Sequence, residues 1–211
     1  GTPADENMLK GFEDVPSIKV EELDTPSRNI LDNINQKYGL SIAEASSTYS
    51  IPVNLIKSII YIESKGDPEA YNSGSGATGL MQVKLVALTD VKQKYCIEGR
   101  ICSDVINNLN INDYWAELMN SEKNIHVGTA YYSLIRNVYL RDSLIGFTED
   151  DSIKYSLLAY NWGIGNINNN CKDNNGRLIA VDNCISKSPN ESKNYVSKVF
   201  NIYNQIYNSG L

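Results

Sequence analysis

The chain reads IESKGDPEAYNSGSGATGLMQ from Ile62 to Gln82. Ile56, Ile60 and Glu63 follow one another at i, i+4 and i+7, which places them on one face of a helix. The run SKGDP directly after Glu63 predicts the end of that helix. Glu63 is therefore predicted at the rim of the core, where partial desolvation raises the pKa of a carboxyl, as a general acid working near neutral pH requires. The alternative is a solvated carboxylate at a helix end, the usual situation of a Glu.

The second half of this stretch is rich in glycine. Gly74, Gly76 and Gly79 lie within six residues, which predicts a loop with unusual backbone angles and close backbone approaches. A glycine cluster can also cradle phosphate, but no Lys-Ser/Thr pair follows as in a P-loop. The loop is therefore not interpreted as a nucleotide site.

Composition narrows the class of protein. The 211 residues are 42% hydrophobic and 21% charged, which is typical of a globular chain, and no apolar run approaches the ~20 residues of a membrane span. Twenty-five acidic residues against 19 basic ones give a net charge of −6 without a basic stripe, which argues against a nucleic-acid partner. The 14 tyrosines suit a sugar-binding cleft, because a tyrosine offers both a flat apolar face and a hydroxyl, but they suit an ordinary core edge equally well.

The four cysteines form two local pairs, Cys96/Cys102 and Cys171/Cys184. An even number in close pairs indicates disulfides and an exported protein, although sequence alone allows three connectivities. Neither pair has the C-x₂-C spacing of a zinc site, and the single histidine, His126, is predicted to be a surface or helix-packing residue. The sequence thus predicts no metal site and requires no cofactor.

The chain divides into two parts. Residues 1–40 are predicted as an N-terminal extension or arm, acidic and rich in turns, with a short helix at 27–38 that Gly39 ends. Residues 41–211 are predicted as one domain, whose first helix opens with a capping-box pattern at 41–44. The start, Gly-Thr-Pro, is typical of an expression or processing start, so an export signal is expected to have been removed.

The domain is predicted to be mainly α-helical with a minor β element. Gly128 is expected to mark a tight crossing of two helices, and the cysteine-flanked segment 171–184 is expected to form a small hairpin around Asn175-Gly176. Beyond the helix of Glu63, helical patterns lie at about 83–94, 112–120, 122–140, 151–161 and 191–208.

Further motifs follow in order: GATGLMQ at 76–82, Asn124-Ile125 with Gly128 and Tyr132, Ala159-Tyr160-Asn161 with Gly163 and Gly165, and Asn194-Tyr195-Val196 with Lys198-Val199. Together with Glu63-Ser64 they resemble the lysozyme-like lytic transglycosylase domain of the soluble-lytic-transglycosylase type, related to goose-type lysozyme, over roughly residues 41–208. Three departures stand out: one extra residue between Glu63 and Ser73, Trp162 where a small residue is usual, and a long stretch between Gln82 and Asn124.

The resemblance implies a lysozyme-like helical fold and a peptidoglycan lytic transglycosylase. Such an enzyme cleaves the MurNAc–GlcNAc β-1,4 bond with a single Glu as general acid and base, and forms 1,6-anhydro-MurNAc. Glu63 matches the catalytic position. The resemblance also implies the substrate-binding residues. Ser73 would hydrogen-bond the acid or the N-acetyl group, and Met81, Gln82 and Asn161 would line the subsites. Tyr160 and Tyr195 would flank the sugar, and one of their hydroxyls would orient Glu63. The alternative for Ser73 is an ordinary serine of a turn, and the alternative for Tyr160 and Tyr195 is core packing.

Two rival functions stay open. A hydrolytic muramidase of the goose-type lysozyme kind would share the architecture, but the nearest further acids, Asp67 and Glu69, are predicted to be solvated. A non-catalytic glycan-binding or assembly protein would instead dock a secretion, conjugation or pilus machine through the arm at 1–40 or the insertion at 83–121. Each of these functions implies an exported protein of the periplasm or cell envelope with peptidoglycan strands as its partner.

Overall fold

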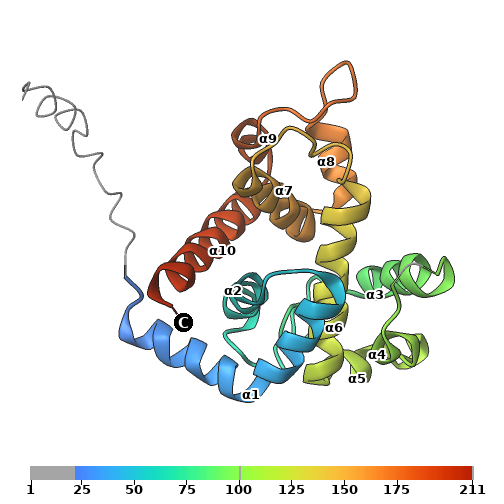
Figure 1. The fold of residues 1–211 in the computed structure, drawn as a ribbon. Coiled ribbons are helices and arrows are strands. Elements are labelled where there is room, and N and C mark those ends of the chain that lie inside the picture. The colour runs from blue at the N-terminus through green and yellow to red at the C-terminus, as the bar shows by residue number, and fades with distance from the viewer. Residues whose placement is uncertain (1–21, 100, 211) are drawn as a thin grey trace, which may run out of the picture.

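The computed structural model describes residues 22–99 and 101–210, and the predicted acidic arm lies largely outside them. The described part is mainly helical (Figure 1), which confirms the predicted fold class. The helices are α1 (Thr25–Tyr49), α2 (Val53–Ser64), α3 (Leu85–Val91), the π-helix η1 (Lys92–Ile97), α4 (Asp104–Asn107), the 3₁₀ turn η2 (Ile111–Asp113), α5 (Tyr114–Met119), α6 (Ser121–Leu134), the π-helix η3 (Ile135–Tyr139), α7 (Glu149–Trp162), α8 (Ile164–Asn170), α9 (Val181–Lys187) and α10 (Asn190–Ser209).

Helix α1 is continuous, so the helix break predicted at Gly39 and the separate helix start predicted at 41–44 are wrong. A glycine inside a helix costs about 1 kcal/mol. Ile34 and Ile42, one on each side of Gly39, are both completely buried, and burying such side chains contributes about 1.5–3 kcal/mol each. Core packing on either side therefore outweighs the local preference. Residue 40, the predicted end of the extension, lies within α1, and the division of the chain into extension and domain stays a prediction.

Helix α6 is the central helix of the fold. Every residue from Asn124 to Ala130 is buried, so the helix is covered on all sides rather than along one stripe. It packs against α1, α3, α5 and α7. Central position in a globular core explains its burial, and among the described residues no helix combines the length and hydropathy that a membrane span would need.

Helix α10 connects two regions that are far apart in the sequence. It packs against both α2 and α7, and the three helices lie beside one another in Figure 1. Tyr195, Val199 and Ile206, on its predicted apolar face, are buried. Because of this packing, the C-terminal ends of α2 and α7 and the first turns of α10 come together.

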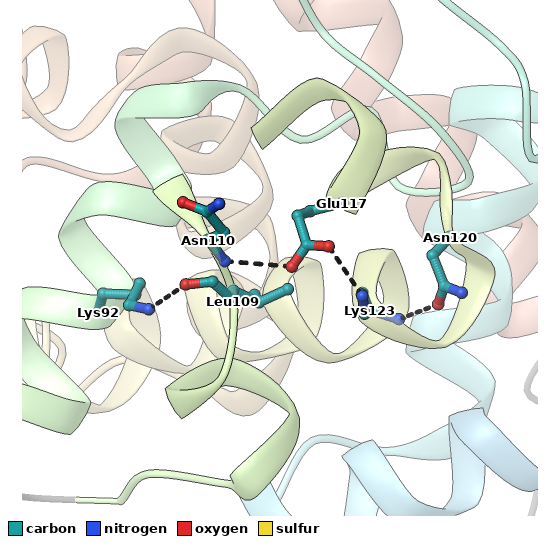
Figure 2. A network of polar contacts seen from close by, with 6 residues as sticks. All are labelled: Lys92, Leu109, Asn110, Glu117, Asn120 and Lys123. Carbon is teal, nitrogen blue, oxygen red and sulfur yellow. Dashed lines mark hydrogen bonds and ion pairs between the residues drawn. The ribbon is translucent and has the colours of Figure 1, made fainter. Parts of the chain in front are cut away.

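The predicted insertion at 83–121 folds into the lobe of α3, η1, α4, η2 and α5 beside α6. Figure 2 shows how polar contacts fix it: the Glu117 carboxylate accepts from the Asn110 backbone N–H at 3.1 Å and pairs with the Lys123 ammonium at 2.9 Å. The Lys92 ammonium donates to the Leu109 carbonyl oxygen. The hydrogen bond from Lys123 and then that from the Asn110 N–H lower the pKa of Glu117. The Lys123 contact also joins the lobe to the first turn of α6.

Within residues 22–99 and 101–210 the β content consists of isolated antiparallel bridges. Two of them, Tyr71 with Thr78 and Thr78 with Val83, hold the glycine-rich loop, and the third, Lys172 with Leu178, closes the small turn predicted around Asn175-Gly176. The predicted cysteine pairs are confirmed, because disulfides join Cys96 to Cys102 and Cys171 to Cys184.

Candidate active site

Glu63 lies in the last turn of α2, at the rim of the core. Ile56 and Ile60, on the same face of the helix, are completely buried, while Glu63 is partly exposed. The helix ends because Lys65 adopts a left-handed conformation (φ 52°) and its N–H donates to the Tyr61 carbonyl oxygen at 3.0 Å. The helical spacing of Ile56, Ile60 and Glu63 thus places the Glu63 side chain one turn beyond the last buried isoleucine of this face.

Glu63 forms part of the wall of a cavity of about 430 Å³, within the size range of small-molecule sites. A smaller cavity of about 110 Å³ lies beside it, and Gln82, Lys84, Tyr160, Asn161 and Trp162 line both. The two therefore form one extended groove. The rest of the larger cavity is lined by Asn72, Gly74, Ser75, Ala77, Pro189, Glu191 and Ser192.

Burial dominates the electrostatics of Glu63. Loss of hydration raises its pKa from 4.5 to about 8. The Tyr195 hydroxyl and then the Lys84 ammonium oppose this rise, because both favour the ionised carboxylate, while the negative charge of Glu191 adds to it. Glu63 is thus protonated at neutral pH and close to the pH at which it releases its proton.

The Tyr195 hydroxyl is buried and makes no regular hydrogen bond with a described residue. It interacts instead with Glu63. Burial raises the pKa of the Tyr195 phenol, and the charge of Glu63 raises it further. Tyr195 does not line the cavity. The Tyr195 hydroxyl thus interacts with the acid, while both predicted roles, flanking the sugar and orienting Glu63, stay predictions.

Tyr160 both lines the groove and supports it. Its side chain lines the cavity, and its hydroxyl donates to the Met81 carbonyl oxygen at 2.7 Å, which anchors the loop. Met81 itself is completely buried and lines neither cavity, which contradicts its predicted place in the substrate subsites. An apolar side chain at the base of a loop is more stable in the core.

A close contact with Gly128 explains the position of Met81. A Cβ atom added to Gly128 would lie 2.7 Å from the Cβ atom of Met81. Gly128 therefore marks the contact of α6 with the glycine-rich loop, and the predicted crossing of two helices at this residue is wrong.

Gln82 fixes the end of the loop. It adopts a left-handed conformation (φ 49°), and its side-chain amide donates to the carbonyl oxygens of Ala70 and Gly79 at 3.0 and 3.1 Å. Gly79 also has a positive φ of 76°, and a Cβ there would lie 2.7 Å from the Leu118 carbonyl oxygen. Only glycine fits this position, since a larger residue would strain the backbone and collide with α5.

Asn124 is the residue that ties the loop to the core, a role that the sequence analysis did not assign. Its side-chain oxygen accepts from the Met81 N–H, and its amide donates to the carbonyl oxygens of Thr78 and Leu118, each at 2.8 Å. Asn124 is completely buried. Asn124 opens the second sequence motif, so its position could have indicated a functional role. A motif does not show, however, which groups a side-chain amide bonds.

The predicted Ser73 is exposed and does not line the cavity, whereas Ser75 of the same loop does. The structure therefore does not bring Ser73 to the acid. Asn161 lines the groove as predicted, and its side-chain oxygen accepts from the Ser192 hydroxyl at 2.7 Å.

Two charged residues of the groove were missed by the sequence analysis. Lys84 follows the glycine-rich loop, and Glu191 lies in the first turn of α10. Neither belongs to a motif, and only the packing of α10 against α2 brings Glu191 near Glu63. The predicted solvated acids, Asp67 and Glu69, are exposed and outside the cavity.

Comparison with known proteins agrees with this geometry. Residues 41–183 match the family model described as the transglycosylase SLT domain. The chain is 30% identical over 190 residues to membrane-bound lytic murein transglycosylase C of Serratia proteamaculans, covering 82% of this chain and 47% of that protein. The namesake of Photorhabdus laumondii is 36% identical over 140 residues, 66% of this chain and 35% of that one. The chain thus spans less than half the length of these relatives.

The fold has also been seen in a solved structure. The X-ray structure of an inactive mutant of the lytic transglycosylase Slt from Pseudomonas aeruginosa is similar with a TM-score of 0.58. The similarity covers 85% of this chain and 28% of that one, at 21% sequence identity. At this identity the likeness shows a shared fold.

Proposed function

Because the chain belongs to the transglycosylase SLT domain family, we propose that it is a peptidoglycan lytic transglycosylase with Glu63 as its acid and base. The observation that carries this proposal is a partly buried carboxyl, with its pKa raised to about 8, in the wall of an extended groove. A groove suits a polymer such as a glycan strand.

The first step needs a proton donor. Protonated Glu63 gives its proton to the oxygen that links MurNAc to GlcNAc, and the bond breaks through an oxocarbenium-like transition state. The N-acetyl oxygen of the substrate stabilises C1 as the leaving sugar departs. The raised pKa supports this step, since it keeps the donor protonated at neutral pH.

The second step reverses the proton transfer. Glu63, now a carboxylate, accepts the proton of the C6 hydroxyl of the same muramoyl residue, and that oxygen bonds to C1. The product is 1,6-anhydro-MurNAc, no water is consumed, and Glu63 returns to its protonated state. Lys84 and the Tyr195 hydroxyl support the intermediate stage, because both favour the ionised carboxylate.

Mass spectrometry of digested peptidoglycan tests the reaction type. We expect muropeptides that end in anhydro-MurNAc, which are one water lighter than hydrolytic products. Products with a reducing MurNAc end as the main species would show hydrolysis instead.

The pH dependence follows from the raised pKa of Glu63. The acid form is active in the first step, so kcat/KM should stay level below pH 8 and fall above an apparent pKa of about 8. The free energy of unfolding should also depend on pH. Because ionising a buried carboxyl is unfavourable, the wild type should lose stability relative to Glu63→Gln as the pH rises from about 4.5 to 8. Rate profiles and urea unfolding across this range measure both. A descending limb near pH 5 would contradict the assignment of the acid.

Tyr195→Phe tests the orienting hydroxyl. Removing a polar group that acts on the catalytic carboxyl should lower turnover about 10²-fold. Because this hydroxyl lowers the pKa of Glu63, the variant should also shift the descending limb of the rate profile to higher pH. Tyr203→Phe, on the same helix but outside the groove, is the control. Unchanged kinetics in Tyr195→Phe would make Tyr195 a packing residue.

One observation favours the hydrolytic muramidase as a second candidate. Glu191 places another carboxylate in the same cavity, and a second carboxylate can activate a water in glycoside hydrolysis. Under the transglycosylase proposal, Glu191→Gln keeps anhydro products. If the wild type makes reducing ends and Glu191→Gln abolishes them, hydrolysis with Glu191 as base is the correct mechanism.

We also propose an exported, cell-envelope location, which the two disulfides and the membrane-bound relatives support. The insertion lobe adds a docking role for envelope machinery, supported by its exposed apolar side chains outside the groove, Ile97, Ile101 and Trp115 among them. Ile97→Ser/Ile101→Ser should clear purified sacculi, which lack such machinery, as fast as wild type. Slower clearing would mean that these side chains contact glycan.

A further inference from the structure

A cluster of one histidine and two glutamates lies outside the groove, where α1 meets α6. His126 and Glu122 are one turn apart on α6, and Glu44 faces them from α1. One possible ligand atom of each lies within 4.8 Å of the other two. None of the three lines the cavities at Glu63, so the mechanism above does not use them.

The histidine distinguishes this cluster from ordinary surface acids. His126 is only 3% exposed, and neither ring nitrogen has a hydrogen-bond partner among the described residues. Buried polar atoms are normally paired, because an unpaired one costs about 1–3 kcal/mol. The Nε2 atom lies 3.8 Å from Glu44 Oε2, too far for a hydrogen bond. The buried imidazole therefore faces the two carboxylates without bonding them.

We propose that Glu44, Glu122 and His126 bind a divalent transition-metal ion, zinc in the first instance. Imidazole and carboxylate suit zinc, and a neutral ring that carries its proton on Nδ1 offers the Nε2 lone pair to the metal. Ligands bonded at about 2.0–2.1 Å to a tetrahedral zinc lie about 3.3 Å apart. The glutamates are exposed, so small rotations of their side chains bring their oxygens that close.

The ion crosslinks α1 to the central helix α6. Its histidine ligand lies two residues after Asn124, which holds the glycine-rich loop. The crosslink therefore stabilises the part of α6 that supports the groove. Three protein ligands leave one position for water. The role is structural, because the site and the Glu63 groove share no residue.

Calorimetric titration of the chelator-treated chain with ZnCl₂ tests the proposal. We expect one zinc per chain and a melting temperature that rises with zinc concentration. Glu44→Gln and Glu122→Gln should each bind at least about tenfold more weakly, since even the loss of an outer-shell partner costs about 10–100-fold. Asp32→Asn, which removes one carboxylate from α1 about 18 Å away along the helix, should bind as wild type does.

His126→Gln should lose the site entirely, and the exposed glutamate variants keep the test valid if that buried change prevents folding. Calcium and magnesium should bind more weakly than zinc, since they prefer sites made only of oxygen atoms. Equal zinc binding by wild type and the double variant Glu44→Gln/Glu122→Gln overturns the proposal, as does a wild type that binds no zinc. Glu63→Gln should bind zinc normally, so the two proposals fail independently.

Discussion

Glu63→Gln should abolish cell-wall lysis while the fold stays intact. The change removes the proton that the mechanism transfers in both directions, yet it changes the side-chain volume little. General acid–base catalysis contributes about 10²–10⁴-fold per group, and Glu63 serves both steps, so we expect a loss of at least about 10³-fold. Clearing of purified sacculi measures the rate, and circular dichroism and thermal unfolding check the fold.

The glutamine should also make the protein more stable at high pH. Burial raises the pKa of Glu63 to about 8, so at higher pH the wild type must keep a charge in a poorly hydrated place. Glutamine carries no charge. Glu69→Gln, an exposed carboxylate outside the groove, is the matched control and should leave both activity and stability near wild type. Muropeptide release near the wild-type rate from Glu63→Gln would refute the assignment.

Asn124→Ala should cause the largest loss of stability among single side-chain truncations at the site. It deletes three buried hydrogen bonds of 2.8 Å and leaves the Met81 N–H without its partner. Summing the lost bonds and the unpaired group gives a cost of about 3–5 kcal/mol. Urea unfolding measures it, and Asn170→Ala, which loses a single exposed bond, should change stability by less than about 0.5 kcal/mol.

Activity should fall together with stability in Asn124→Ala. The Met81 carbonyl oxygen, beside the released N–H, holds the Tyr160 hydroxyl, so movement of the loop disturbs a wall of the groove. If Asn124→Ala unfolds at the wild-type urea concentration, the amide does not hold the loop.

The sequence predicted features that depend on short stretches of chain. The spacing of Ile56, Ile60 and Glu63 placed the acid at the rim of the core, because helical periodicity decides which side chains share a face. Short cysteine spacings indicated the two disulfides, which the structure confirms. The prediction at Gly39 was wrong, because a local helix-breaking preference of about 1 kcal/mol is weaker than core packing on both sides.

Within the site, the sequence named residues but not always their positions. Met81 and Ser73 both belong to the motif region, yet one is buried under α6 and the other is exposed. A motif fixes residue types, whereas the path of the loop decides which side each residue faces. The path depends on Asn124, 43 residues after Met81, and on the space left by Gly128.

What the sequence determined by itself was the helical class, the end of the helix that carries Glu63, and the glycine positions that let the loop approach α5 and α6. Helical periodicity, helix-stop residues and the absence of a Cβ atom act over a few residues, so they can be followed along the chain. The tertiary structure alone decided the surroundings of the acid. Tyr195 and Glu191 reach Glu63 only because α10 packs against α2, and Lys84 reaches it from the end of the glycine-rich loop. The burial that raises the Glu63 pKa requires all these elements at once, and no local pattern encodes it.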